Sequence, residues 1–192
     1  EPPPAKKGAK RAVNPVIPGA KEVIDNLRWM FPTAKTYLPP EATKERAIAE
    51  SGSYRYVVYY THGLADETNP WLSAIYFTDS KGAQAPLTVT EAMRLLRLDK
   101  TDLVVLGACE TARGQLSKGE GVMGLTRGLF YAGARGVIST GWSVAEASSR
   151  DIVIGTFQGI HLGLDPAKAL QMAQRDVRKR SYGGMPGSHP FY

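Results

Sequence analysis

The chain has 192 residues, of which 43% are hydrophobic and 22% charged, so it is large and apolar enough to bury a core, and disorder throughout is excluded. Its longest apolar runs fall far short of the roughly 20 residues that a membrane-spanning helix needs. A single cysteine, Cys109, excludes an internal disulfide and a cysteine-based zinc site. We therefore expect a protein of a reducing, cytoplasmic setting that needs neither a metal nor an organic cofactor.

The N-terminal end of the chain is rich in proline and lysine. Its prolines oppose regular structure, so residues 1–18 are predicted to be a linker to a missing upstream region, with the domain at residues 19–192. The net charge of +6 depends mainly on two cationic clusters, Lys6, Lys7, Lys10 and Arg11, and Arg175, Arg178, Lys179 and Arg180. The first lies in this linker and the second at the end of a predicted helix, where cations suit the helix dipole. We therefore expect neither nucleic acid nor a membrane as a partner.

Helices and strands alternate along the predicted domain. Helices are predicted at residues 20–30, 43–49, 122–131 and 145–162, and two more begin at the capping box Thr88 to Glu91 and at Asp165-Pro166. Buried strands are predicted at residues 56–60, 102–106 and 136–140, and one more apolar run covers residues 72–77. This order predicts an α/β fold, with a mostly parallel central sheet and helices on both of its faces.

Two chemically reactive residues follow predicted strands. His62 comes after the first strand and Cys109 after the second. Because the carboxyl ends of parallel strands meet at one edge of a sheet, we expect the two side chains to lie close together. A neighbouring histidine favours the thiolate and can accept and return a proton, as a nucleophilic cysteine requires. Gly63 and Gly107 leave room for a substrate backbone, and the amides of Gly63 and Cys109 are candidates for an oxyanion hole.

Each candidate could also have a purely structural role. A lone cysteine at the end of a buried strand is more often an inert core residue, and a lone histidine is more often structural. Their pairing at two strand ends favours the catalytic interpretation. A different hypothesis comes from Gly119-Glu120-Gly121-Val122-Met123-Gly124, which matches the glycine pattern of dinucleotide-binding loops. That pattern belongs directly after a strand, whereas about ten residues intervene here, so the match is weak.

Several motifs, in order, resemble the CHAT domain, a caspase-like peptidase module. Up to the cysteine they are Tyr60-Thr61-His62-Gly63, Trp71-Leu72-Ser73-Ala74 and residues 102–112. Beyond it they are residues 119–125, Tyr131-Ala132-Gly133-Ala134-Arg135, Thr140-Gly141-Trp142-Ser143-Val144, Ala169-Leu170 and His189-Pro190-Phe191-Tyr192. The series covers about residues 16–192.

The resemblance implies a caspase-like three-layer sandwich and a cysteine endopeptidase of the clan of caspases and separases. Its catalytic dyad maps onto His62 and Cys109, and Trp142-Ser143 becomes a wall of the peptide cleft, with Glu110 as a further candidate substrate-binding residue. The implied partners are a protein substrate in extended form and an upstream repeat region that senses an activating partner. The alternative is a catalytically inactive interaction or regulatory module with the same fold.

The sequence departs from the family's pattern at the end of the chain, and the charges near its cysteine differ from those expected of caspases that accept aspartate. Members commonly continue past the position of Tyr192 with a tryptophan and a final apolar strand, so that strand is expected to be truncated here. Glu110, Glu120 and Glu146 outnumber Arg113 around the expected cleft. This balance predicts that a basic or apolar residue, rather than aspartate, is preferred before the cut bond.

Overall fold

The parallel sheet is the centre of this computed structural model, which describes residues 17–66, 68–107, 120–140 and 144–188. Its three strands are β1 (Tyr56–Tyr60), β5 (Leu103–Gly107) and β6 (Val137–Ile138), in the order β1-β5-β6. β5 is the central strand and is buried along its whole length. The register pairs Tyr56 with Leu103 and Tyr60 with Gly107, so β1 and β5 end side by side.

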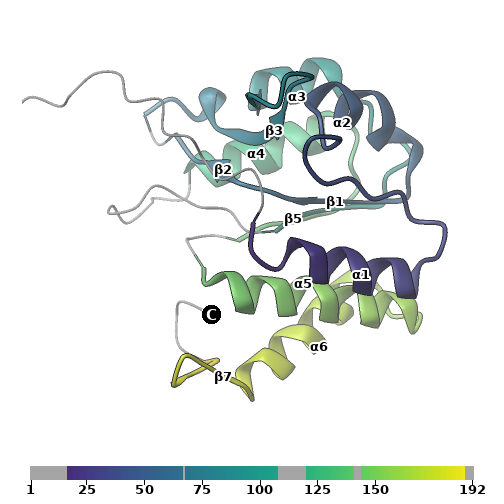
Figure 1. The fold of residues 1–192 in the computed structure, drawn as a ribbon, viewed down its shortest axis with the longest axis vertical. Helices are drawn as coiled ribbons and strands as arrows, with labels where there is room; N and C mark the ends of the chain where they lie inside the picture. Colours follow the sequence, from purple (N-terminus) through teal and green to yellow (C-terminus); the bar gives the residue numbers. More distant parts are fainter. Residues whose placement is uncertain (1–16, 67, 108–119, 141–143, 189–192) are drawn as a thin grey trace, which may run out of the picture.

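Helices cover both faces of this sheet (Figure 1). They are α1 (Ala20–Met30), α2 (Lys44–Glu50), α3 (Val89–Leu95), α4 (Glu120–Tyr131), α5 (Glu146–His161) and α6 (Pro166–Arg178). Side chains of α3 and α4 pack on Val57, Tyr59, Val104 and Leu106, and α2 lies on the same side. Those of α1 and α5 pack on the opposite face, and α6 lies outside α5. The helices on the two faces bury the sheet between two apolar layers.

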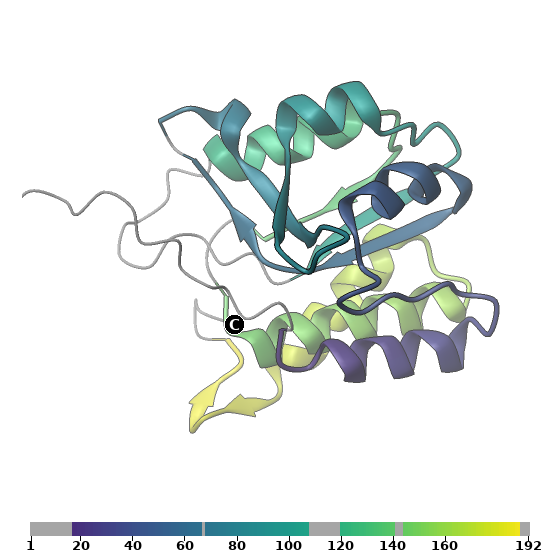
Figure 2. The same cartoon turned by 45° about the horizontal axis from the view of Figure 1, so that its top comes forward.

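A small antiparallel sheet follows directly after β1. It consists of β2 (Gly63–Leu64), β3 (Ala74–Thr78) and β4 (Gln84–Thr88), with β3 in the middle. A short 3-10 helix, η2 (Pro70–Leu72), precedes β3, and another, η1 (Ser51–Ser53), follows α2. A terminal hairpin of β7 (Ser181–Tyr182) and β8 (Met185–Pro186) forms a third sheet beyond α6, as Figure 2 shows.

The helices agree closely with the sequence predictions. α1 has the predicted bounds, Thr43 caps α2, and the capping box at Thr88 and Glu91 opens α3 with both of its hydrogen bonds. Asp165 caps α6, with Pro166 in the first turn. α5 begins one residue after the predicted start. The starts of α2, α3 and α6 are set by local side-chain hydrogen bonds, which the sequence specifies directly.

The parallel sheet is smaller than predicted, and the apolar run at residues 72–77 does not belong to it. The predicted strand at residues 136–140 is only Val137–Ile138, whose side chains are half-buried at the sheet edge. The apolar run at residues 72–77 is split between η2 and the antiparallel strand β3, which turns back through Asp79 and Gly82 into β4. The protein is therefore a mixed α/β fold with a small parallel sheet, and the larger central sheet expected from the sequence is not present among the described residues.

Candidate active site

His62 lies where the chain passes from the parallel sheet into the antiparallel one. It follows β1 by two residues, and its carbonyl oxygen accepts a hydrogen bond of 2.9 Å from the amide of Tyr76 on β3. The side chain of the preceding Thr61 donates to the Tyr76 carbonyl oxygen. The His62 side chain is half-buried, with its Nδ1 atom inside the protein. Both sheets thus hold the backbone of the candidate histidine at the carboxyl edge of β1.

Gly63, the described candidate for the oxyanion hole, is buried at the start of β2. Gly63 pairs with Ile75 of β3. The preceding residue, His62, is the one whose carbonyl oxygen accepts a hydrogen bond from β3. In an antiparallel ladder, hydrogen-bonded and non-hydrogen-bonded pairs alternate. The pair of Gly63 and Ile75 is therefore a non-hydrogen-bonded one, and the Gly63 amide points away from β3.

On the neighbouring strand, β5 ends at Gly107, two residues before Cys109 in the sequence. An ideal Cβ atom at Gly107 would lie 2.4 Å from Cδ2 of Tyr60, so only glycine fits beside this ring. Cys109, Glu110, Trp142 and Ser143 lie outside the described residues. The structure thus places His62 and Gly63 and leaves the other predicted site residues as predictions.

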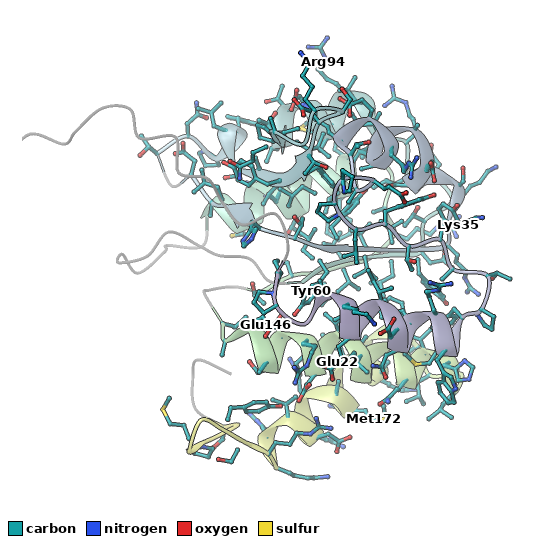
Figure 3. All side chains as sticks on the ribbon, in the orientation of Figure 1. Glu22, Lys35, Tyr60, Arg94, Glu146 and Met172 are labelled. Carbon is teal, nitrogen blue, oxygen red and sulfur yellow. The ribbon has the colours of Figure 1, made fainter. Side chains whose placement is uncertain are left out.

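Tyr60 and Glu146 form a contact that the sequence did not predict. The Tyr60 hydroxyl donates a hydrogen bond of 3.0 Å to Oε1 of Glu146 in the first turn of α5, and Figure 3 shows the two side chains between the sheet and that helix. Burial, assisted by the Glu146 carboxylate, raises the pKa of Tyr60 well above its usual value. The sequence treated Glu146 only as a charge near the cleft, whereas its carboxylate also accepts this hydrogen bond; its effect on acidic substrates stays a prediction.

The loop after β2 is shaped by its own side chains. Oδ1 of Asp66 accepts hydrogen bonds from the amides of Thr68 and Asn69, at 3.0 and 2.8 Å. The hydroxyl of the fully buried Ser73 accepts a hydrogen bond of 2.9 Å from the Asp66 amide. These Asx-type contacts fix the loop that follows His62 and carries η2, on which Trp71 and Leu72 are exposed.

The third parallel strand contributes a buried hydroxyl near the same edge. Thr140 follows β6 by two residues, and its Oγ1 atom is buried without a hydrogen-bond partner among the described residues. Burying a hydroxyl without a hydrogen bond is costly, so such a group is a candidate for a functional contact. The sequence offered one signal for it, since Thr140 is the last residue of the strand predicted at residues 136–140.

The described part of the glycine motif at residues 119–124 is helical and not a loop. Its described part, from Glu120 to Gly124, lies in the first turns of α4. A Cβ atom at Gly124 would lie 3.0 Å from the carbonyl oxygen of Pro70, so this glycine allows α4 to pack against η2. In the part of the chain that the structure describes, no group of three or more His, Cys, Asp or Glu residues is placed to hold a metal ion.

Comparison with protein families agrees with the motifs found in the sequence. A family model, the CHAT domain, matches residues 4–192. The chain therefore belongs to the CHAT domain family, whose members are related to caspase-like cysteine peptidases. No match was found among curated proteins. No described helix has the length and apolar character to cross a membrane.

Proposed function

We propose that the protein is a cysteine endopeptidase that cleaves a protein substrate with a His62–Cys109 dyad. The observation that carries this proposal is the register of β1 and β5, in which Tyr60 pairs with Gly107. His62 and Cys109 each follow one member of this pair by two residues. Two residues of chain span at most about 7 Å, so the register allows the two side chains to meet.

In this proposal His62 acts first as a base and then as an acid. It accepts the Cys109 thiol proton, and the thiolate attacks the carbonyl carbon of the scissile peptide bond. The negative oxygen of the tetrahedral intermediate accepts hydrogen bonds from the amides of Gly63 and Cys109. The C–N bond then breaks, the leaving amine takes the proton from His62, and a thioester remains. Water, deprotonated by His62, hydrolyses the thioester and returns the thiol.

The remaining parts of the proposal concern the substrate and its control. Glu110, Trp142 and Ser143 are proposed to line the cleft for an extended peptide. For Trp142 and Ser143 this rests on the resemblance to the CHAT family, and for Glu110 on its place next to Cys109. An upstream repeat region or an activating partner is proposed to control cleavage, in a cytoplasmic setting. The caspase-like sandwich belongs to the same proposal and is supported by membership of the CHAT family.

The test is cleavage of a proteome-derived peptide library by the parent chain and by three variants. Cys109→Ala should abolish cleavage, and His62→Ala should lower the rate by a factor of at least about 100, the lower range for loss of a general base. The matched control is His161→Ala, because His161 lies at the end of α5 and stacks with Trp29 and Phe31, away from β1's carboxyl end. Cleavage by Cys109→Ala at the parent's rate would refute the dyad. No cleavage by the parent would favour an inactive interaction module.

A further inference from the structure

An exposed apolar surface, which we call the shelf, lies beside the candidate active site. It consists of four large apolar side chains with exposed fractions between 36 and 58%: Leu64, Trp71, Leu72 and Met123. They belong to β2, η2 and the first turn of α4, and η2 packs on α4 where Pro70 lies against Gly124. Single exposed apolar residues are common, whereas several on neighbouring elements usually mark a binding site.

The backbone of η2 is held by hydrogen bonds around the two shelf residues that it carries. The Asn69 side chain accepts the Trp71 amide at 3.3 Å, and the Asn69 carbonyl oxygen accepts the Leu72 amide at 2.9 Å. The carbonyl oxygen of the fully buried Ser73 accepts the amide of Val89 at 2.9 Å. A segment that is already ordered and still exposes a tryptophan and a leucine pays little further entropy when it binds, which favours affinity.

Leu64 connects the shelf to the candidate active site. It directly follows Gly63, whose amide points away from β3 and is proposed to bind the oxyanion. It also pairs with Ala74 of β3, the second residue after Leu72. α4 connects the parallel strands β5 and β6, so its first turn lies at the carboxyl edge of the sheet, as His62 does (Figure 1).

The proposed chemistry decides which half of a substrate would reach the shelf, so this inference rests on the proposed function. In the tetrahedral intermediate the carbonyl carbon is bonded to Cys109, and the leaving amine takes its proton from His62. The half before the cut bond therefore stays with Cys109. The half after the cut bond begins at His62, and from there the protein chain continues through Leu64 to η2.

We propose that the shelf binds the first residues after the cut bond and selects apolar side chains there. Leu64 contacts the first of these residues, and Trp71 and Leu72 contact the next. An apolar side chain would bury the exposed surface of the shelf, whereas a charged or hydroxylated one would lose water without gaining a hydrogen-bond partner. Trp71 and Leu72 are thus specificity-determining residues for the leaving half of the substrate.

Two matched peptides test this proposal. They share the residues before the cut bond, taken from the sequences that the parent cleaves best in the peptide library, and carry either Leu-Leu or Ser-Ser after it. The parent should cleave the Leu-Leu peptide with a kcat/KM at least about tenfold higher. The double substitution Trp71→Ser with Leu72→Ser should lower this ratio to about threefold or less, whereas Trp71→Phe with Leu72→Met should keep it.

Two controls separate the shelf from the dyad and from exposed tryptophan in general. The methyl ester of the same acyl half releases methanol, which has no side chain to contact the shelf, so the parent and the double serine variant should hydrolyse it equally fast. Trp29→Ser should leave the ratio of the two peptides unchanged, because Trp29 is also exposed but lies at the end of α1 beside His161.

Capture of the thioester by added amines gives a second test, because it reverses the first half of the reaction. The amine attacks the thioester carbonyl, its proton passes through His62 to the departing thiolate, and a new amide bond forms in competition with hydrolysis. In the parent, Leu-Leu amide should capture the thioester at least about tenfold better than Ser-Ser amide. In the double serine variant the two amines should capture it equally well.

Three results would overturn the proposal. The same ratio for the parent and the double serine variant, with the methyl ester hydrolysed, would exclude the shelf and leave the dyad intact. No hydrolysis of the methyl ester or of either peptide by the parent would refute the proposed function and the role of the shelf with it. Self-association of the parent that the double serine substitution abolishes, measured by sedimentation, would identify a second copy of the chain as the occupant.

Discussion

Tyr60 connects the end of β1 to the first turn of α5 through one hydrogen bond to Glu146. Tyr60→Phe should lower the free energy of unfolding by about 2 kcal/mol, because the lost bond has a charged acceptor. Tyr56→Phe is the matched control: it removes a hydroxyl from the same face of β1, and the described residues show no hydrogen bond to that hydroxyl. It should change the stability by less than about 0.5 kcal/mol. Urea unfolding measures both, and equal effects would contradict this role of Glu146.

Tyr59 gives the fold a defined sensitivity to alkali. Its hydroxyl donates to Ser51, and burial raises the pKa of Tyr59 to about 12, against about 10 in an unfolded chain. Between these two values the unfolded chain loses the proton while the folded chain keeps it. The stabilisation is therefore complete below pH 10 and is lost as the pH rises toward 12.

Replacing Tyr59 with phenylalanine removes this titration. Between pH 9 and pH 11, the parent should lose about 1.4 kcal/mol more of its free energy of unfolding than Tyr59→Phe does. The variant also lacks the hydrogen bond to Ser51, so the comparison concerns the change with pH and not the absolute stability. Parallel pH profiles for parent and variant would show that Tyr59 ionises as easily in the folded chain as in the unfolded one.

At the scale of elements, the register of β1 and β5 depends on the absence of a side chain at Gly107. Gly107→Ala would place a Cβ atom 2.4 Å from the Tyr60 ring and 3.3 Å from Val153. We expect it to cost about 1–3 kcal/mol, as overpacking usually does. In a Tyr60→Val background the ring is gone, so the same substitution should cost at least about 1 kcal/mol less. A double-mutant cycle in urea measures this coupling, and additive costs would exclude the contact.

The helices could be predicted from the sequence because their ends are local. Thr43, Thr88 and Asp165 each cap the residues that follow them, and the apolar spacing supplies the buried face. The antiparallel sheet could not be predicted in this way. Only Leu87 of β4 is buried, and Pro86 is exposed, so the strand has no apolar run and exists because β3 pairs with it.

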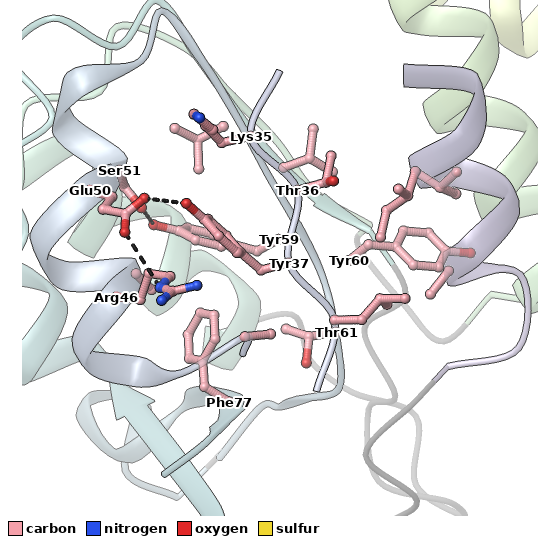
Figure 4. Close-up of a pocket in the computed structure, with 18 of the residues that line it drawn as sticks. Lys35, Thr36, Tyr37, Arg46, Glu50, Ser51, Tyr59, Tyr60, Thr61 and Phe77 are labelled. Carbon is pink, nitrogen blue, oxygen red and sulfur yellow. Dashed lines mark hydrogen bonds and ion pairs between the residues drawn. The ribbon is translucent and has the colours of Figure 1, made fainter. Parts of the chain in front are cut away.

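At the scale of the whole molecule, the sequence predicted where His62 and Gly63 lie but not the contact between Tyr60 and Glu146 beside them. The strand-end pattern predicted the positions of His62 and Gly63 because a parallel sheet brings strand ends to one edge. The bond from Tyr60 to Glu146 joins residues 86 positions apart, and no local pattern specifies it. The apolar cavity beside β1 is equally non-local, since its walls come from α1, α2 and residues 33–39 (Figure 4).

The whole arrangement makes the carboxyl edge of the parallel sheet the centre of the proposed chemistry. β1 positions His62, and β5 ends beside β1. The hydrogen bond from Tyr60 connects the end of β1 to α5.

The central claim, that His62 activates Cys109, is tested most directly by the pH dependence of cysteine alkylation. The chain has one cysteine, so incorporation of iodoacetamide reports on Cys109 alone. An isolated thiol has a pKa of about 8.5, whereas a histidine partner keeps a thiolate at lower pH. At pH 6.5 the parent and the His161→Gln control should therefore react at least about tenfold faster than His62→Gln, with the difference disappearing above pH 9. Equal rates for the parent and His62→Gln at pH 6.5 would contradict the dyad.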